Sequence, residues 1–152
     1  MEKIASFTVD HDILEPGIYV SRIDGDIVTY DLRFIKPNTP PFLENGALHT
    51  IEHLFATYMR NGRFGRNIIY FGPMGCRTGF YLIVRDLSNK DTLALIKETL
   101  TQALAHTGDI PGNTAKECGN YLDHDVEGAM RDMAKYYDTV KDWTIYDLQY
   151  KK

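Results

Sequence analysis

The most informative segment of this chain is His49-Thr50-Ile51-Glu52-His53. Its two histidines stand four residues apart, so on a helix of about 3.6 residues per turn both imidazoles lie on one face, within reach of one metal ion. Glu52 flanks that face, close enough to act on whatever the metal ion binds. The pattern predicts a metal site, although two polar residues on a solvated helix face would show the same spacing. A metal site also requires further ligands and a helix that carries it.

The residues around this motif predict a half-buried helix. Apolar side chains recur there at helical spacing, namely Leu48, Ile51, Leu54, Phe55, Tyr58 and Met59. Asn45 or a neighbour can cap the start of the helix, and Asn61-Gly62 is a good C-terminal stop. The preceding loop, residues 36–41, contains three prolines, which end the strand before it.

Other apolar runs predict strands and further helices. Residues 18–20, 23–27 and 28–35 are rich in β-forming residues, and the Asp24-Gly25 step indicates a hairpin. Alternation in the last run places Val28, Tyr30, Leu32 and Phe34 on one face and Arg33 on the other, where the pattern favours a solvated arginine. Residues 67–71 and 79–85 predict two more strands. Ser88 with Asp91 forms a capping-box pattern at the start of a helix, and residues 125–140 predict a more polar helix.

Bulk composition narrows the classes of protein to which the chain can belong. With 152 residues and 43% hydrophobic side chains, it is expected to form a single domain, residues 1–152. A formal net charge of −4 argues against nucleic acid as a partner. The N-terminus lacks the apolar run of a signal peptide, and no segment approaches the roughly 20 apolar residues of a membrane span. We therefore expect a cytoplasmic protein without a membrane partner.

The two cysteines, Cys76 and Cys118, are candidates for chemistry, because two thiols are too few for a disulfide framework. Zinc or ferrous iron accepts two imidazoles and one thiolate and keeps an open position. Either cysteine could supply that thiolate, which would leave the other free for proton transfer. Cys76 lies in the glycine-rich turn 72–79, which lacks the lysine of a phosphate-binding loop. For His124, a surface position is favoured over a role in supporting the metal ligands.

Several motifs together resemble those of the S-ribosylhomocysteine lyase (LuxS) family, in the same order over nearly the whole chain. They are residues 6–11, Tyr30-Asp31-Leu32-Arg33-Phe34, His49-Thr50-Ile51-Glu52-His53, Pro73-Met74-Gly75-Cys76-Arg77-Thr78-Gly79-Phe80-Tyr81, Cys118-Gly119 and His124-Asp125-Val126-Glu127-Gly128-Ala129. The resemblance implies an α+β fold in which an antiparallel sheet packs against helices in a two-layer sandwich. It also implies a lyase that converts S-ribosylhomocysteine into homocysteine and 4,5-dihydroxypentane-2,3-dione, the precursor of autoinducer-2.

The resemblance further implies roles for individual residues. His49, His53 and Cys118 would bind the metal ion, with Cys76 and Glu52 as the acid/base pair. The substrate-binding positions would be Ser6, His11 and Arg33 at the sugar end and Arg60 at the amino-acid end. We expect one divalent metal ion per subunit, iron(II) in preference to zinc(II) or cobalt(II), although this ligand set does not by itself distinguish them. The partners would be the small-molecule substrate and a second subunit, in a homodimer with its active sites at the interface.

The chain departs from the family pattern at two positions. Tyr70 stands where familiar members carry an aspartate, and Gly72 stands where they carry a serine. That aspartate helps to hold the homocysteine part of the substrate, so recognition of this end is expected to differ here.

Two other functions would use the same motif. His-x-x-Glu-His is also the inverted zinc motif of a class of metallopeptidases, which are normally longer and take a carboxylate as third ligand. The other is a zinc-stabilised binding module without enzymatic activity, in which Cys76 would close the site as a fourth ligand.

Overall fold

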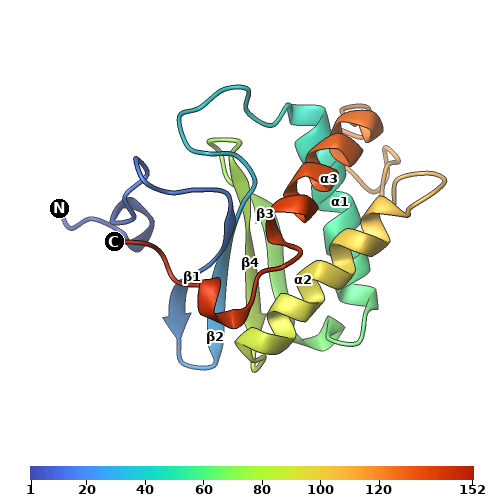
Figure 1. The fold of residues 1–152 in the computed structure, drawn as a ribbon. Coiled ribbons are helices and arrows are strands. Elements are labelled where there is room, and N and C mark those ends of the chain that lie inside the picture. The colour runs from blue at the N-terminus through green and yellow to red at the C-terminus, as the bar shows by residue number, and fades with distance from the viewer.

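Four antiparallel strands form one layer of the molecule, and three helices form the other (Figure 1). The computed structural model describes residues 1–152. Its sheet has the order β1 (Gly17–Asp24), β2 (Ile27–Arg33), β4 (Gly79–Arg85) and β3 (Ile68–Pro73). The helices are α1 (Asn45–Asn61), α2 (Asn89–Leu104) and α3 (Val126–Val140), with short 3₁₀ turns at Ala5–Phe7, Gly65–Asn67 and Ile145–Asp147. The architecture confirms the α+β two-layer expectation.

Local sequence signals explain where these elements begin and end. Gly25 adopts a φ of 63° in the tight turn that joins β1 to β2, which confirms the predicted hairpin. Strand β2 ends at Arg33, two residues earlier than the apolar run suggested. Ser88 accepts a hydrogen bond from the backbone N–H of Asp91, as its capping pattern predicted. In the same way Asp125 caps α3 by accepting from Gly128 N–H.

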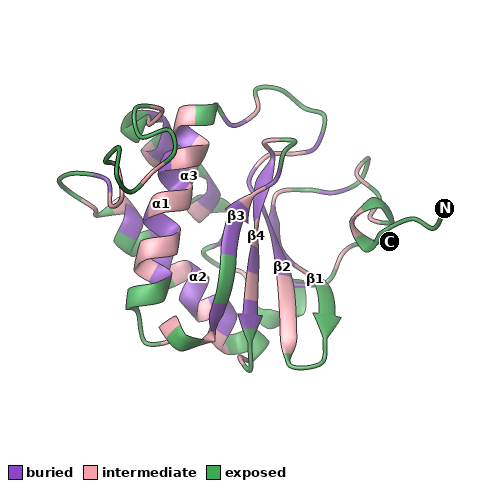
Figure 2. Ribbon diagram, turned by 180° about the vertical axis from the view of Figure 1, so that it is seen from behind, coloured by how far each residue is buried: buried purple, intermediate pink, exposed green.

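The hydrophobic core lies between the two layers. Tyr30, Leu32 and Phe34 point from β2 and the residues after it into this core, as their alternation predicted. Helix α1 faces them with Ile51, Leu54, Phe55 and Met59, all of them fully buried. Figure 2 shows this burial along the helices and strands, and it shows that the edge strand β3 exposes its middle part, which contains Ile69 and Tyr70. No helix combines the length and the apolar character that a membrane span requires.

The prediction of a solvated Arg33 is wrong. Its side chain is buried on the sheet face opposite Tyr30 and Leu32, which point into the core. One of its nitrogens, Nη2, donates to Asp31 Oδ2 at 2.7 Å, and Tyr150 near the C-terminus donates to the same oxygen at 2.7 Å. Burial by itself would lower the pKa of Arg33, but the Asp31 carboxylate raises it, so that Arg33 stays charged.

Alkaline pH is expected to destabilise the protein through the tyrosines that cover this ion pair. Burial, followed by the charges of Asp31 and Glu15, raises the pKa of Tyr19 to about 12, and burial and Asp31 also raise that of Tyr150. In the unfolded chain the tyrosines have a pKa of about 10. This contribution to the free energy of unfolding is therefore complete below about pH 10 and is lost as the pH rises towards about 12.

Urea unfolding at a series of pH values measures this loss. The series runs from about 8 to about 11.5, on both sides of the pKa of a free tyrosine. The Tyr19→Phe variant should lose less stability over the same range, because phenylalanine has no phenol to ionise in the unfolded state. A variant whose pH dependence equals that of the wild type would contradict the assignment.

Candidate metal centre and substrate pocket

Helix α1 and the loop between α2 and α3 bring the three expected metal ligands together. The side chains of His49 and His53 project from one face of α1, and Cys118 reaches them from the loop. Cys118 Sγ lies 3.4 Å from His49 Nε2 and 3.8 Å from His53 Nε2. In a tetrahedral site with metal–nitrogen bonds of about 2.1 Å and metal–sulfur bonds of about 2.3 Å, nitrogen and sulfur are about 3.6 Å apart. Both nitrogen–sulfur distances are therefore close to what one divalent metal ion requires.

Backbone carbonyl groups set the proton positions on both histidines. His49 Nδ1 is 2.8 Å from the carbonyl oxygen of Asp123, and His53 Nδ1 is 2.7 Å from that of Pro111. A carbonyl oxygen can only accept a hydrogen bond, so each Nδ1 must carry the proton. Each Nε2 then offers its lone pair to a metal ion, the usual arrangement of histidine ligands. The donor set thus fits a metal ion in chemistry as well as in spacing.

The prediction of a surface position for His124 is wrong. This residue is partly buried, and its ring stacks on that of His49 with the ring centroids 4.1 Å apart. Ligand atoms of His124, His49, His53 and Cys118 all lie within 4.8 Å of one another. Burial, followed by the neighbouring imidazoles, lowers the pKa of His124. The following residue holds it there, because Asp125 N–H donates to both Gly46 O and Thr50 Oγ1 of α1.

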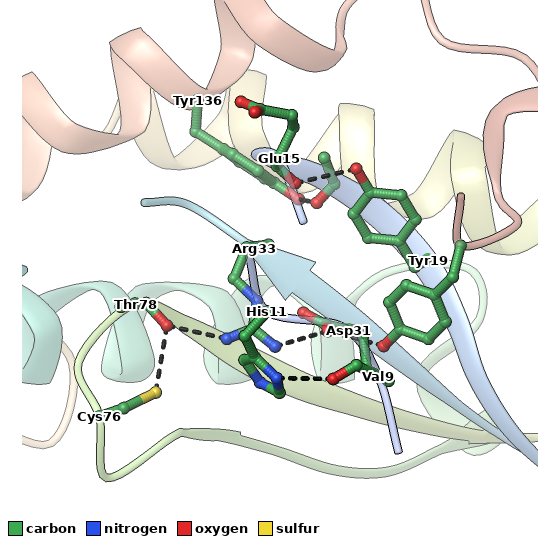
Figure 3. A network of polar contacts seen from close by, with 11 residues as sticks. Val9, His11, Glu15, Tyr19, Asp31, Arg33, Cys76, Thr78 and Tyr136 are labelled. Carbon is green, nitrogen blue, oxygen red and sulfur yellow. Dashed lines mark hydrogen bonds and ion pairs between the residues drawn. The ribbon is translucent and has the colours of Figure 1, made fainter. Parts of the chain in front are cut away.

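Cys76 lies in a different cavity, on the sheet face that also carries Arg33. This cavity of about 530 Å³ has Ser6, His11, Arg33 and Cys76 in its wall. Figure 3 shows how Thr78 connects two of them: Arg33 Nη1 donates to Thr78 Oγ1 at 2.8 Å, and that oxygen lies 3.1 Å from Cys76 Sγ. His11 is held by a contact of 2.8 Å between its Nδ1 and Val9 O. The thiol therefore faces a cavity whose wall includes a fixed positive charge.

Glu52 and Arg60 occupy other places. Glu52 lines a second cavity of about 530 Å³ together with His53, Phe71, Pro111, Gly112 and Glu117. None of these residues lines the cavity of Cys76, so one chain holds the expected acid/base pair in two separate cavities. Arg60 lies exposed at the end of α1, where its Nη2 is 3.3 Å from Ile69 O on β3. Cys76 is also absent from the metal cluster, which excludes the closed zinc site that would use it within one chain.

Residues that pattern reasoning missed include Asp31 and Tyr150, which hold Arg33 in place. The available signal was the strand alternation itself, since it put Asp31 on the same face as Arg33, two residues away. For Tyr150, 119 residues from Asp31 along the chain, no local signal exists.

Tyr70 and Gly72, the two positions expected to depart from the family pattern, form one structural unit. The ring of Tyr70 lies over Gly72, so a β-carbon at position 72 would be 2.5 Å from Tyr70 Cζ and closer still to its hydroxyl oxygen. Gly72 is therefore what allows Tyr70 to take this position, and a serine there is incompatible with the ring as it lies.

This pairing predicts non-additive effects on stability. Gly72→Ser alone should lower the free energy of unfolding, because it displaces the Tyr70 ring, whereas adding Tyr70→Asp should recover about 1 kcal/mol of the loss. Chemical denaturation of the two single variants and the double variant measures this coupling. Gly75→Ser is the matched control, since a β-carbon at that glycine meets nothing within 4 Å. Additive effects at positions 70 and 72 would show that the two positions are independent.

Comparison with known proteins agrees with these features. Residues 4–147 match the model of a family described as S-ribosylhomocysteinase (LuxS). A protein of Clostridium acetobutylicum named S-ribosylhomocysteine lyase is 48% identical over an alignment that covers 90% of this chain and 87% of that protein. A protein of the same name from Borrelia garinii is 45% identical, over 99% of this chain and 99% of that protein. Another from Phocaeicola vulgatus is 47% identical, over 99% of this chain and 97% of that protein. With the family model and full-length relatives in agreement, the chain belongs to the S-ribosylhomocysteinase (LuxS) family.

Proposed function

We propose that this protein is an S-ribosylhomocysteine lyase that releases homocysteine and 4,5-dihydroxypentane-2,3-dione. The observation that carries the proposal is the ligand cluster of His49, His53 and Cys118, spaced for one metal ion in a chain of this family. The metallopeptidase alternative has no support in this cluster, because its third group is a thiol and not a carboxylate.

The reaction defines what the site must do. A carbon–sulfur bond at sugar C5 breaks readily by β-elimination when the proton on C4 is acidic, which requires a carbonyl group at C3. The substrate begins with its carbonyl group at C1. The carbonyl group must therefore migrate twice, through enediolates, with a proton removed and returned at neighbouring carbon atoms before the thiolate leaves.

The metal ion would be held by the Nε2 atoms of His49 and His53 and by the Cys118 thiolate. When bound, a divalent ion with an open position supplies Lewis-acid polarisation of substrate carbonyl groups. Iron(II) is our first choice, and zinc(II) and cobalt(II) are alternatives that the same donor set accepts.

Cys76 is proposed as the base and acid of the carbonyl migrations. Its thiol faces the cavity and contacts Thr78, which itself accepts a hydrogen bond from Arg33. The thiolate is the form of a cysteine that removes a proton. Glu52, beside the ligand His53, is proposed for the later proton transfers. Ser6, His11 and Arg33 would bind the sugar end of the substrate, and Arg60 the amino-acid end.

The proposed active unit is a homodimer. Each of its two active sites combines the metal cluster of one subunit with the Cys76 cavity of the other. The support is that one chain places Cys76 and the metal ligand His53 in cavities that share no residue, although the chemistry requires both at one substrate. Exposed apolar side chains at Phe7, Ile69 and Tyr70 provide surface that a second subunit can cover. The cytoplasmic location and the lack of a nucleic-acid partner stay predictions from the sequence.

Subunit mixing tests this arrangement. A Cys76→Ala subunit retains its metal half and a His53→Ala subunit retains its thiol half, so a mixed dimer has one complete site. Random exchange between two inactive homodimers should therefore restore about a quarter of wild-type activity. A mixture that stays inactive after verified subunit exchange would place the whole site within one subunit.

The function itself is tested by incubating anaerobically purified, metal-replete protein with S-ribosylhomocysteine. Homocysteine release is followed with a thiol-reactive dye, and a sample stripped with a chelator and then refilled with iron(II) serves as control. Release that disappears on stripping and returns on refilling is the expected result. No release from metal-replete protein would refute the proposed lyase activity.

A further inference from the structure

The imidazole of His124 carries a buried nitrogen atom that has no hydrogen-bond partner. This atom, Nε2, is shielded from solvent, and His124 belongs to the same cluster as His49, His53 and Cys118. Buried polar atoms in folded proteins nearly always have a partner, and an exception often marks a place where a ligand binds. The unpaired nitrogen therefore points to a group that arrives with the substrate or with the metal ion.

The contacts of Thr50 distinguish His124 from the two histidine ligands. Thr50 Oγ1 is 2.9 Å from His124 Nδ1 and also accepts a hydrogen bond from Asp125 N–H at 3.1 Å. The hydroxyl proton of Thr50 then has one acceptor among its contacts, His124 Nδ1. A Nδ1 atom that accepts leaves the proton of the neutral ring on Nε2. His49 and His53 have the opposite tautomer, because carbonyl oxygens hold their Nδ1 protons.

The angles between the imidazole rings also distinguish His124 from His49 and His53. The rings of His49 and His53 meet at 89°, as two ligands that approach one ion from different directions can do. The rings of His49 and His124 are nearly parallel, at 16°, with centroids 4.1 Å apart. A histidine binds a metal ion in the plane of its ring, and one ion cannot lie in two stacked planes. His124 is thus beside the metal position without being aimed at it as a ligand.

We propose that His124 is a catalytic residue that donates a hydrogen bond from Nε2–H to an oxygen atom at the reacting end of the substrate, and is not a fourth metal ligand. This inference rests on the proposed lyase function. Removal of a proton beside a carbonyl group places negative charge on the carbonyl oxygen. A neutral N–H donor that is already held in position by Thr50 stabilises this charge without reorganisation, and loss of one such donor typically lowers kcat by about 10²–10³-fold.

Two variants separate the hydrogen-bond donor from the ring. His124→Phe keeps an aromatic ring that can stack on His49 but has no N–H, whereas His124→Gln loses the ring and keeps an N–H donor of similar reach. We expect both to bind one equivalent of cobalt(II) with the visible absorption spectrum of the wild type. We expect kcat for homocysteine release to fall by about 10²-fold or more in His124→Phe and to recover in part in His124→Gln.

The results discriminate between the alternatives. Loss of cobalt, or an altered absorption spectrum in both variants, would show that His124 is a ligand and overturn the proposal. Near-normal kcat in metal-replete His124→Phe would overturn it as well. If wild-type protein released no homocysteine, the lyase function would fail, but the spectra would still decide whether His124 binds the metal ion.

Discussion

Replacement of Cys76 by alanine should lower kcat for homocysteine release by about 10²–10⁴-fold, the usual contribution of a positioned acid/base group. The thiol lies in the cavity with Arg33, in contact with Thr78, and no other cysteine lines that cavity. Alanine cannot accept or return a proton, and the carbonyl migrations require both steps. Because Cys76 does not belong to the metal cluster, the variant should keep its full metal content.

Cys118→Ala is the matched control for this experiment. It removes the other thiol of the chain, whose sulfur lies 3.4 Å and 3.8 Å from the two histidine nitrogens. This variant should lose its metal ion together with its activity. Elemental analysis and turnover, measured on both variants, therefore assign separate roles to the two cysteines. Near-normal turnover by metal-replete Cys76→Ala would refute its role as base.

Replacement of Asp31 by alanine should lower the free energy of unfolding by about 3–5 kcal/mol, because it leaves the charge of Arg33 buried without a partner. Asp31 and Arg33 are 1% and 3% exposed, and their side chains are 2.7 Å apart. The variant also removes the acceptor of the Tyr150 hydroxyl, so the C-terminal residues lose an attachment. A loss of this size is a large part of the roughly 5–15 kcal/mol that stabilises a typical domain.

An exposed ion pair provides the control for the stability measurement. Arg63 and Glu98 are also 2.7 Å apart, but their side chains are 59% and 49% exposed. Glu98→Ala should therefore cost no more than about 1 kcal/mol, since water solvates the remaining charge. Denaturant unfolding of both variants compares two ion pairs that have the same nitrogen–oxygen distance but differ in burial. Equal losses would show that burial of the Arg33 charge does not decide its contribution.

The Asp31–Arg33 pair also shows how far strand patterns can predict. Alternation correctly placed both residues on the sheet face opposite the core, and for an antiparallel sheet that face is commonly solvated. Here the chain termini cover it, with Tyr150 in contact with Asp31. Such cover comes from contacts between residues far apart in sequence, which have no period and leave no local pattern.

His124 and the two cysteines show the same limit at the site. Local pattern predicted one thiol beside the histidines but could not choose between Cys76 and Cys118, because a residue in a loop has no spacing rule that connects it to a helix. Only the family resemblance implied Cys118. The structure brings Cys118 to α1 and leaves Cys76 in the cavity of Arg33. The position of His124 depends on Asp125 and Thr50, residues 75 positions apart along the chain.

Local sequence patterns correctly predicted the features that repeat over short distances. The helical period put His49 and His53 on one face, and Gly25 and Ser88 marked the hairpin and a helix start through local backbone and capping chemistry. Local patterns did not reveal which thiol meets the histidines, that Arg33 is buried, or that His124 joins the cluster with a buried, unpaired Nε2; these depend on the tertiary structure. The physical reason is that backbone periodicity acts over a few residues, whereas burial and long-range hydrogen bonds depend on how all the elements pack together.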